Sequence, residues 1–183
     1  MDVFEAIKSR TSYRGIFKNQ PIPREHLIQI VQAGLDAPSA KNVQTTRFVI
    51  IDDKELIRKM TGSLPKRDFF KTCQAMILCI TDKHPQSVLE SHQFQIEDCA
   101  AAVENMLLAI TALGYATVWI DGMLRLERIA EKIAEVIHLP DNKKVQILLP
   151  LGVPAEQGPR KEKMPFDERA WFNVYPNKEM NDA

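Results

Sequence analysis

The sequence predicts an α/β domain in which helices cover a central sheet. Short apolar runs of strand length alternate along the chain with longer segments whose apolar residues recur at helical spacing. The run at residues 75–81 is apolar almost throughout, which is typical of a strand covered on both faces. With 183 residues the chain is long enough to bury a core, and a single domain over residues 1–183 is expected.

The first half of the chain shows one local signal per element. Residues 2–9 form an amphipathic helical pattern, and residues 25–36 form a second one that starts just after Pro23. The apolar run at residues 47–51 has strand length and ends at two aspartates. A short helix is then expected over residues 54–61, with a cap at Gly62.

The second half continues the alternation. The longest helix is expected over residues 92–113, because helical spacing persists until Gly114; its small residues at 99–102 would let another helix approach closely. The remaining elements are a strand at 117–120, a helix at 126–137 that ends before Pro140, and a strand at 145–151. From Gly152 onwards prolines predict an extended tail. The alternation alone fits a parallel sheet as well as an antiparallel one.

Composition excludes several function classes. The formal net charge is zero, so no overall field favours nucleic acid or an anionic membrane. The first residues lack the features of a signal peptide, and three cysteines without a C-x-x-C pair predict inert packed thiols and a cytoplasmic protein. The seven glycines form neither a dinucleotide fingerprint nor a P-loop, and no metal-ligand spacing or G-x-S-x-G elbow is present.

Two short polar clusters follow predicted helices. Arg10-Thr11-Ser12-Tyr13-Arg14 combines two guanidiniums, two hydroxyls and a phenol, which is the composition of an anion site. Ala37-Pro38-Ser39-Ala40-Lys41-Asn42-Val43-Gln44 resembles an amide-rich pocket lip, in which Pro38 fixes the direction of the chain. Together the clusters indicate a ligand with a phosphate and a ring. Solvated arginines at a helix end and a Ser or Asx turn before a strand remain the alternatives.

Cations also gather near the other end of the chain, at Arg160, Lys161 and Lys163. If the fold brings residues 10–14 and 160–163 together, they form one phosphate site. This convergence is a geometric prediction that the structure can contradict.

The two clusters resemble the N-terminal signatures of the nitroreductase family of FMN-dependent oxidoreductases, R-x-S-x-R and A-P-S-x-x-N-x-Q. Leu113–Gly122 resembles the family's flavin-covering strand and loop, and residues 151–155 with 161–165 resemble its C-terminal phosphate-contacting segment. The resemblance covers residues 2–172 in the expected order. It implies a mostly antiparallel central sheet and a homodimer with two active sites shared across the interface.

The resemblance also implies roles for individual residues. Arg10 would contact the FMN phosphate beside Thr11 and Ser12, and Arg14 would lie near the pyrimidine edge of the ring. Pro38, Ser39, Asn42 and Gln44 would reach the ligand from the neighbouring subunit, although Gln44 could simply brace its loop. The residues expected to cover or contact the ring are Lys66, Trp119, Ile120, Asp121 and Gly122, and those expected to complete the phosphate site are Lys161 and Lys163. A core aromatic at a strand end is the alternative for Trp119.

The expected function is reduction of a small planar acceptor, such as a nitroaromatic or a quinone, by hydride that passes from NADH or NADPH through flavin N5. No side chain need act as a catalytic residue, because the flavin carries the chemistry. Two alternatives remain open. One is a flavin enzyme of another reaction, such as reductive dehalogenation or enone reduction; the other is a flavin-binding carrier or regulator with little turnover.

The aromatic residues of the tail predict packing against a second surface. Phe166, Trp171, Phe172 and Tyr175 fall in a segment, 152–183, that carries few helix signals. We expect this tail to pack on the partner subunit of a homodimer. The alternative is that it wraps around its own domain.

Overall fold

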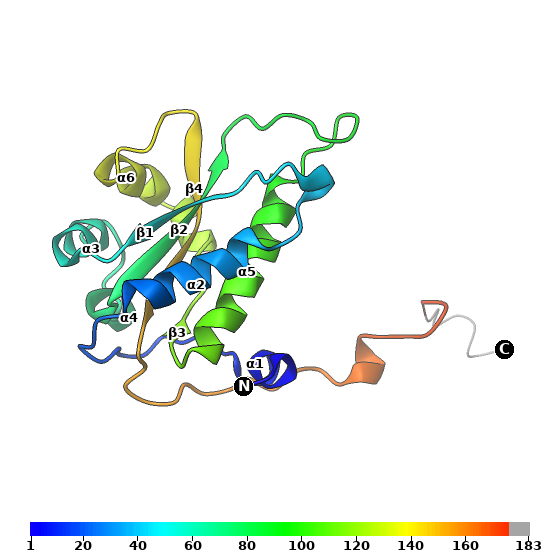
Figure 1. The fold of residues 1–183 in the computed structure, drawn as a ribbon, viewed down its shortest axis with the longest axis horizontal. Coiled ribbons are helices and arrows are strands. Elements are labelled where there is room, and N and C mark those ends of the chain that lie inside the picture. The colour runs from blue at the N-terminus through cyan, green and yellow to red at the C-terminus, as the bar shows by residue number, and fades with distance from the viewer. Residues whose placement is uncertain (176–183) are drawn as a thin grey trace.

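The computed structural model describes residues 1–175, and these contain a four-stranded antiparallel sheet with helices on both faces (Figure 1). The strand order is β1-β2-β4-β3. The bounds are Arg47–Ile51 for β1, Ala75–Asp82 for β2, Ala116–Thr117 for β3 and Lys143–Gly152 for β4. All three pairings are antiparallel, which confirms the sheet expected from the resemblance and excludes the parallel arrangement.

β2 is the centre of the sheet, and alternate residues on it face opposite helix layers. Ile77 and Cys79 join a core with α2 (Arg24–Leu35) and α5 (Gln95–Ala112). Met76 and Leu78 join the second core, which contains residues of α3 (Lys54–Thr61), α4 (Asp68–Thr72) and α6 (Ile129–Val136). Covering on both faces explains why this strand is apolar almost throughout.

α2 and α5 approach closely through small residues. A Cβ atom added at Gly34 of α2 would lie 2.9 Å from Met106 Cγ and 3.3 Å from the carbonyl oxygen of Ala102 on α5. Cys99 and Ala102 are both buried in the same core. The small residues of α5 therefore pack against α2 of the same chain.

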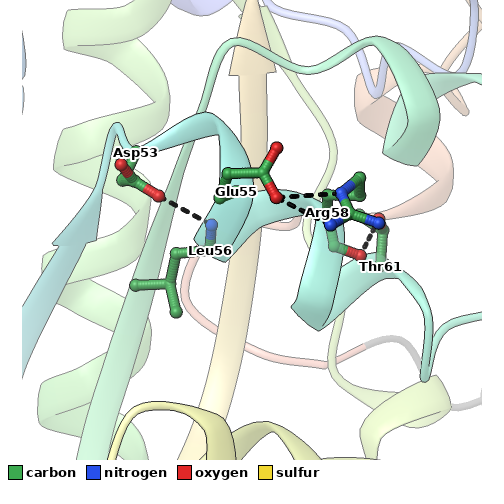
Figure 2. A network of polar contacts seen from close by, with 5 residues as sticks. All are labelled: Asp53, Glu55, Leu56, Arg58 and Thr61. Carbon is green, nitrogen blue, oxygen red and sulfur yellow. Dashed lines mark hydrogen bonds and ion pairs between the residues drawn. The ribbon is translucent and has the colours of Figure 1, made fainter.

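Local side-chain contacts explain why α3 forms where the sequence predicts it. The Asp53 carboxylate accepts a hydrogen bond from the amide of Leu56 at 2.7 Å and caps the helix (Figure 2). Glu55 pairs with Arg58 one turn later at 2.7 Å, and the Thr61 hydroxyl donates to the carbonyl oxygen of Arg58 at 3.1 Å. α1 (Val3–Ser9) begins in a similar way, with a capping box between Asp2 and Glu5.

Several predicted boundaries are wrong. α6 begins at Ile129 because Glu127 and Arg128 adopt left-handed φ values of 48° and 56°, which a right-handed helix cannot contain. α5 begins at Gln95, three residues later than predicted. β3 ends at Thr117, and Ile120 returns to the sheet only through a bridge to Leu148. The sequence did not predict α4 or the short 3₁₀ turns at Ala40–Asn42, Gly122–Arg125 and Phe166–Glu168.

After β4 the chain runs past α1 and then extends away from the body of the protein (Figure 1). Apart from the turn at Phe166–Glu168 it has no regular structure up to residue 175, and residues 176–183 of the predicted tail lie outside the described part. Phe172 and Tyr175 are about 80% exposed. Within residues 152–175 the tail aromatics pair with one another: the ring centroids of Trp171 and Tyr175 lie 4.7 Å apart.

None of the helices within residues 1–175 combines the length and the apolarity needed to cross a bilayer.

Candidate functional site

The two ends of the chain meet at a hollow of about 1270 Å³, which we call the phosphate hollow. Its walls are the end of α1, the irregular segment that follows, and residues 155–163 after β4. Six cations and two carboxylates line it, so its charge balance favours an anion. The cations are Lys8, Arg10, Arg14, Arg160, Lys161 and Lys163. The predicted convergence of residues 10–14 with 160–163 is therefore present in the geometry.

Backbone hydrogen bonds hold these ends together. The amide of Lys18 donates to the carbonyl oxygen of Val153 at 2.8 Å, and the amide of Ala155 donates to that of Ile16 at 2.9 Å. Phe17 forms a bridge with Pro154 between them. Tyr13 and Phe17 are buried below this contact, with ring centroids 5.1 Å apart. The buried side chains of Tyr13 and Phe17 thus anchor the polar segment at residues 10–14 to the core.

Arg10 lies in the wall of the phosphate hollow. Its Nε lies 3.7 Å from a carboxylate oxygen of Glu104, a residue of α5, and its side chain is 25% exposed. Thr11 and Ser12 border the same space. The Arg10 side chain is mostly buried and pairs with Glu104, so it is not a fully solvated arginine at a helix end.

A second hollow of about 560 Å³ adjoins the first and shares Arg14 with it; we call it the ring hollow. Its other predicted members are Lys66, Trp119, Ile120, Asp121 and Gly122. Of these, Ile120 is buried and Trp119 is half-buried. Trp119 also packs against the core formed by α2 and α5, so it both lines the ring hollow and contributes to the core.

Gly122 opens the wall of the ring hollow. A Cβ atom added there would meet no protein atom within 4 Å. Nothing within the described chain therefore requires glycine at this position, whereas a ligand in the hollow could. Next to it, the Asp121 carboxylate accepts two hydrogen bonds from Arg125, at 2.9 and 2.8 Å, which also raise the pKa of that guanidinium.

The second polar cluster lies elsewhere. In Figure 1 the turn at residues 40–42 is beside the first turns of α5, whereas α1 is near the other end of the same helix. Pro38, Ser39 and Asn42 border neither hollow, and Gln44 lines a separate pocket. A single chain therefore does not bring the two clusters together.

The loop at 39–45 is braced from within. The Ser39 hydroxyl accepts a hydrogen bond from the backbone amide of Gln44 at 3.0 Å. A local serine contact of this kind was the alternative interpretation of this cluster. Asp98 of α5 accepts from the amide of Ala40 at 2.9 Å and from the hydroxyl of Thr45 at 2.8 Å.

Sequence reasoning missed three residues with roles at these sites: Asp98, Glu104 and Arg125. Asp98 is an acid near the start of the longest predicted helix, and such an acid can hold the amides of a loop. Arg125 follows Asp121 at the i,i+4 spacing of a helical ion pair, which was a readable signal. Glu104 gave no local signal, because its partner Arg10 is far away in the sequence.

The chain is similar to several known proteins. The model of the nitroreductase family matches residues 7–64 and 61–153. A protein of Methanothermobacter thermautotrophicus, provisionally named NADH dehydrogenase/NAD(P)H nitroreductase, is 31% identical over 85% of this chain and 79% of its own length. A protein of Archaeoglobus fulgidus with the same provisional name is 30% identical over 85% of this chain and 87% of its own length. A solved structure from Bacteroides thetaiotaomicron, also so named, aligns with a TM-score of 0.80 at 26% identity, over 94% of this chain and 98% of its own.

Proposed function

This chain belongs to the nitroreductase family of oxidoreductases, and we propose that it binds FMN in the two adjoining hollows and reduces a small planar acceptor with NADH or NADPH. The observation that carries the proposal is the convergence of Arg10 and Arg14 with Lys161 and Lys163 on one hollow, beside a second hollow lined by Trp119. Nitroaromatics and quinones are the acceptors that we propose.

The phosphate hollow fits the phosphate of FMN. Guanidinium and ammonium groups bind phosphate through charge-assisted hydrogen bonds, and the hydroxyls of Thr11 and Ser12 add neutral donors. Lys161 and Lys163 act as point charges, whereas Arg10 offers a fork of donors. Glu104 keeps Arg10 in place and partly offsets its charge.

The ring hollow fits a flat ring system. Trp119 and Ile120 supply apolar surface, and the missing side chain at Gly122 leaves the backbone open to close approach. Arg14, shared by both hollows, would place positive charge near the pyrimidine edge, and Lys66 adds a second cation. The flavin held there would supply the hydride-transfer chemistry between a nicotinamide and the acceptor. The residues of the chain would bind and orient it.

We also propose that the active unit is a homodimer, in which Ser39 and Asn42 of one protomer complete the site of the other. Two observations support this arrangement. The second cluster lies apart from both hollows of its own chain. Large apolar side chains are exposed on α1 and on the tail, including Phe4 at 78% and Phe172 at 81%, and exposed patches of this kind mark interaction surfaces.

Absorbance spectroscopy tests the proposed function. The purified protein should show a flavin spectrum, and the released cofactor should be FMN. The band should bleach when NADH or NADPH is added without oxygen, and it should return when a quinone is added. A protein that binds flavin and does not bleach would be a carrier, and one that binds no flavin would contradict the proposal.

A further inference from the structure

A pocket of about 670 Å³ lies along the first half of β4, and this volume is typical of small-molecule sites. Its walls are the turn at Gly122–Arg125, the first turns of α6, the start of β4 and Ile96 of α5. It shares Asp121 with the ring hollow, and it shares no residue with the phosphate hollow or with the loop at 38–44. We call it the Gln146 pocket.

Gln146 is the extra residue of a β-bulge in β4. Cys79 of β2 pairs with Ile147, and the next residue, Ile80, pairs with Val145, so Gln146 has no partner on β2. On the other side of β4 the pairing ends at the bridge between Leu148 and Ile120, and no described strand runs beside Gln146. Bulges redirect side chains and are frequent beside functional sites. Here the bulged residue lines the pocket.

The Gln146 side chain is buried and has no protein partner. The residue is 8% exposed, and its side-chain amide forms no hydrogen bond with any residue within 1–175. Its nitrogen and oxygen keep accessible surface, in contrast to fully enclosed unpaired atoms such as Gln95 Oε1. Buried side-chain amides are usually satisfied, so Gln146 is free both to donate to and to accept from a ligand in the pocket.

The charges around the pocket favour a dianion. Two of its five cations are engaged, because Arg125 pairs with Asp121 at 2.8 Å and Lys143 pairs with Asp82. The other lining charges, three cations and one carboxylate, form no ion pair with a described residue: Lys83, Arg128, Lys144 and Glu131. Two positive charges therefore remain in excess. A phosphate monoester carries about two negative charges near neutral pH.

The start of α6 adds backbone donors to the same pocket. Arg128 precedes the helix and makes no capping hydrogen bond with its side chain. The amides of Ala130 and Glu131 in the first turn donate to no acceptor within the described chain. Both residues line the pocket. Unpaired amides at a helix N-terminus favour an anion, as do the cations beside them.

We propose that the Gln146 pocket binds a small phosphate monoester whose organic body carries a hydrogen-bond donor beside an acceptor. Arg128, Lys144 and the amides of the first turn of α6 would hold the phosphate. Gln146 would pair with the donor and the acceptor, and the buried side chains of Leu124 and Val145 would contact the body. The site does not require the proposed flavin, because the carboxylate of Asp121, the one shared residue, is already paired with Arg125.

Isothermal titration calorimetry with AMP, GMP, CMP and UMP tests this site, because the edge of a nucleobase presents donors and acceptors side by side. The full-length protein is first saturated with FMN, so that the probes cannot occupy the phosphate hollow. At least one nucleotide should bind about tenfold more tightly than its nucleoside, which lacks the phosphate. It should also bind about tenfold more tightly than ribose 5-phosphate, which lacks the base. If no nucleotide binds more tightly than both of these reference compounds, the proposal is wrong.

Three variants assign the binding to this pocket. Arg128→Gln and Lys144→Gln should each weaken the nucleotide and ribose 5-phosphate alike, by about tenfold at low salt. Gln146→Leu should remove the preference for the nucleotide and leave the binding of ribose 5-phosphate in place.

Two exposed lysines outside the pocket provide matched controls. Lys132→Gln on α6 and Lys59→Gln on α3 should keep the affinity within about twofold of wild type, since exposed charges at a distance are screened. Wild-type affinity in both Arg128→Gln and Lys144→Gln would overturn the proposal. An unchanged preference for the nucleotide in Gln146→Leu, with a melting temperature that shows a folded protein, would overturn it as well.

Discussion

The backbone amide of Tyr13 donates a hydrogen bond to the carbonyl oxygen of Thr117 at 2.8 Å. Ser12 forms a parallel bridge with the same residue. These contacts lay the polar cluster at 10–14 beside the chain that leads to Trp119, so that Arg14 borders both hollows. One local pairing thus sets the phosphate hollow and the ring hollow side by side.

Arg10 and Glu104 should affect FMN binding in opposite directions. Arg10→Ala removes a charge-assisted contact worth about 1.5–3 kcal/mol and should weaken FMN binding at least tenfold. Glu104→Gln removes a carboxylate from a hollow rich in cations and should tighten FMN binding a few-fold, since a partly exposed pair is worth about 0.2–1 kcal/mol. Flavin fluorescence titration measures both, with Lys59→Ala as control. Weaker binding in Glu104→Gln would mean that holding Arg10 in place matters more than the lost charge.

Two glycine substitutions should separate stability from ligand binding. Gly34→Ala places a methyl group 2.9 Å from Met106 Cγ and should lower the free energy of unfolding by about 1–3 kcal/mol. Gly122→Ala meets no protein atom within 4 Å, so the melting temperature of the flavin-free protein should not fall. Its affinity for FMN should fall, because the methyl group enters the ring hollow. Unchanged FMN affinity in Gly122→Ala would remove this residue from the proposed site.

The proposed sharing of Ser39 and Asn42 between protomers can be tested by complementation. Arg10→Ala and Asn42→Ala proteins should each have low activity. After verified subunit exchange, each heterodimer should contain one intact site and one doubly defective site, and its activity should rise toward half of the wild-type value. If activity does not rise although mixed dimers form, Asn42 acts within its own protomer or not at all.

Cys73 should make stability depend on alkaline pH. Burial raises the pKa of its thiol to about 12 from an ordinary value of 9.0, and the thiol also donates to the carbonyl oxygen of Phe70 at 3.3 Å. Above pH 9 the unfolded chain loses this proton while the folded chain keeps it, so the free energy of unfolding falls as pH rises toward 12. The slope for one proton is about 1.4 kcal/mol per pH unit. Urea unfolding between pH 9 and 11 should show a shallower slope for Cys73→Ala, and equal slopes would contradict the assignment.

The sequence predicted the elements better than their ends. The apolar run at 75–81 and the helical spacing at 54–61 carry their own signals, and both elements formed within one residue of the predicted bounds. The start of α6 could not be predicted, because the left-handed backbone at Glu127 and Arg128 has no composition signal. α4 spans only five residues, too short for helical periodicity to show.

The sequence indicated many of the residues that line the candidate site, but it did not indicate how these residues are arranged in space. Arg10 and Lys163 have the right chemistry wherever they lie, and only the pairing of residues 16–18 with 153–155 brings them together. The Arg10–Glu104 contact depends on how α1 packs against α5, and no local pattern encodes this.

The central claim is that cations from both ends of the chain bind the phosphate of a flavin, and comparison of FMN with riboflavin tests it most directly. The flavin-free protein should bind FMN at least about a hundredfold more tightly than riboflavin, because two charge-assisted contacts, from Arg10 and Lys163, are lost with the phosphate. In the Arg10→Ala/Lys163→Ala double variant this difference should largely disappear while the affinity for riboflavin stays the same. Equal affinities of the wild-type protein for the two flavins, or an undiminished difference in the double variant, would contradict the account.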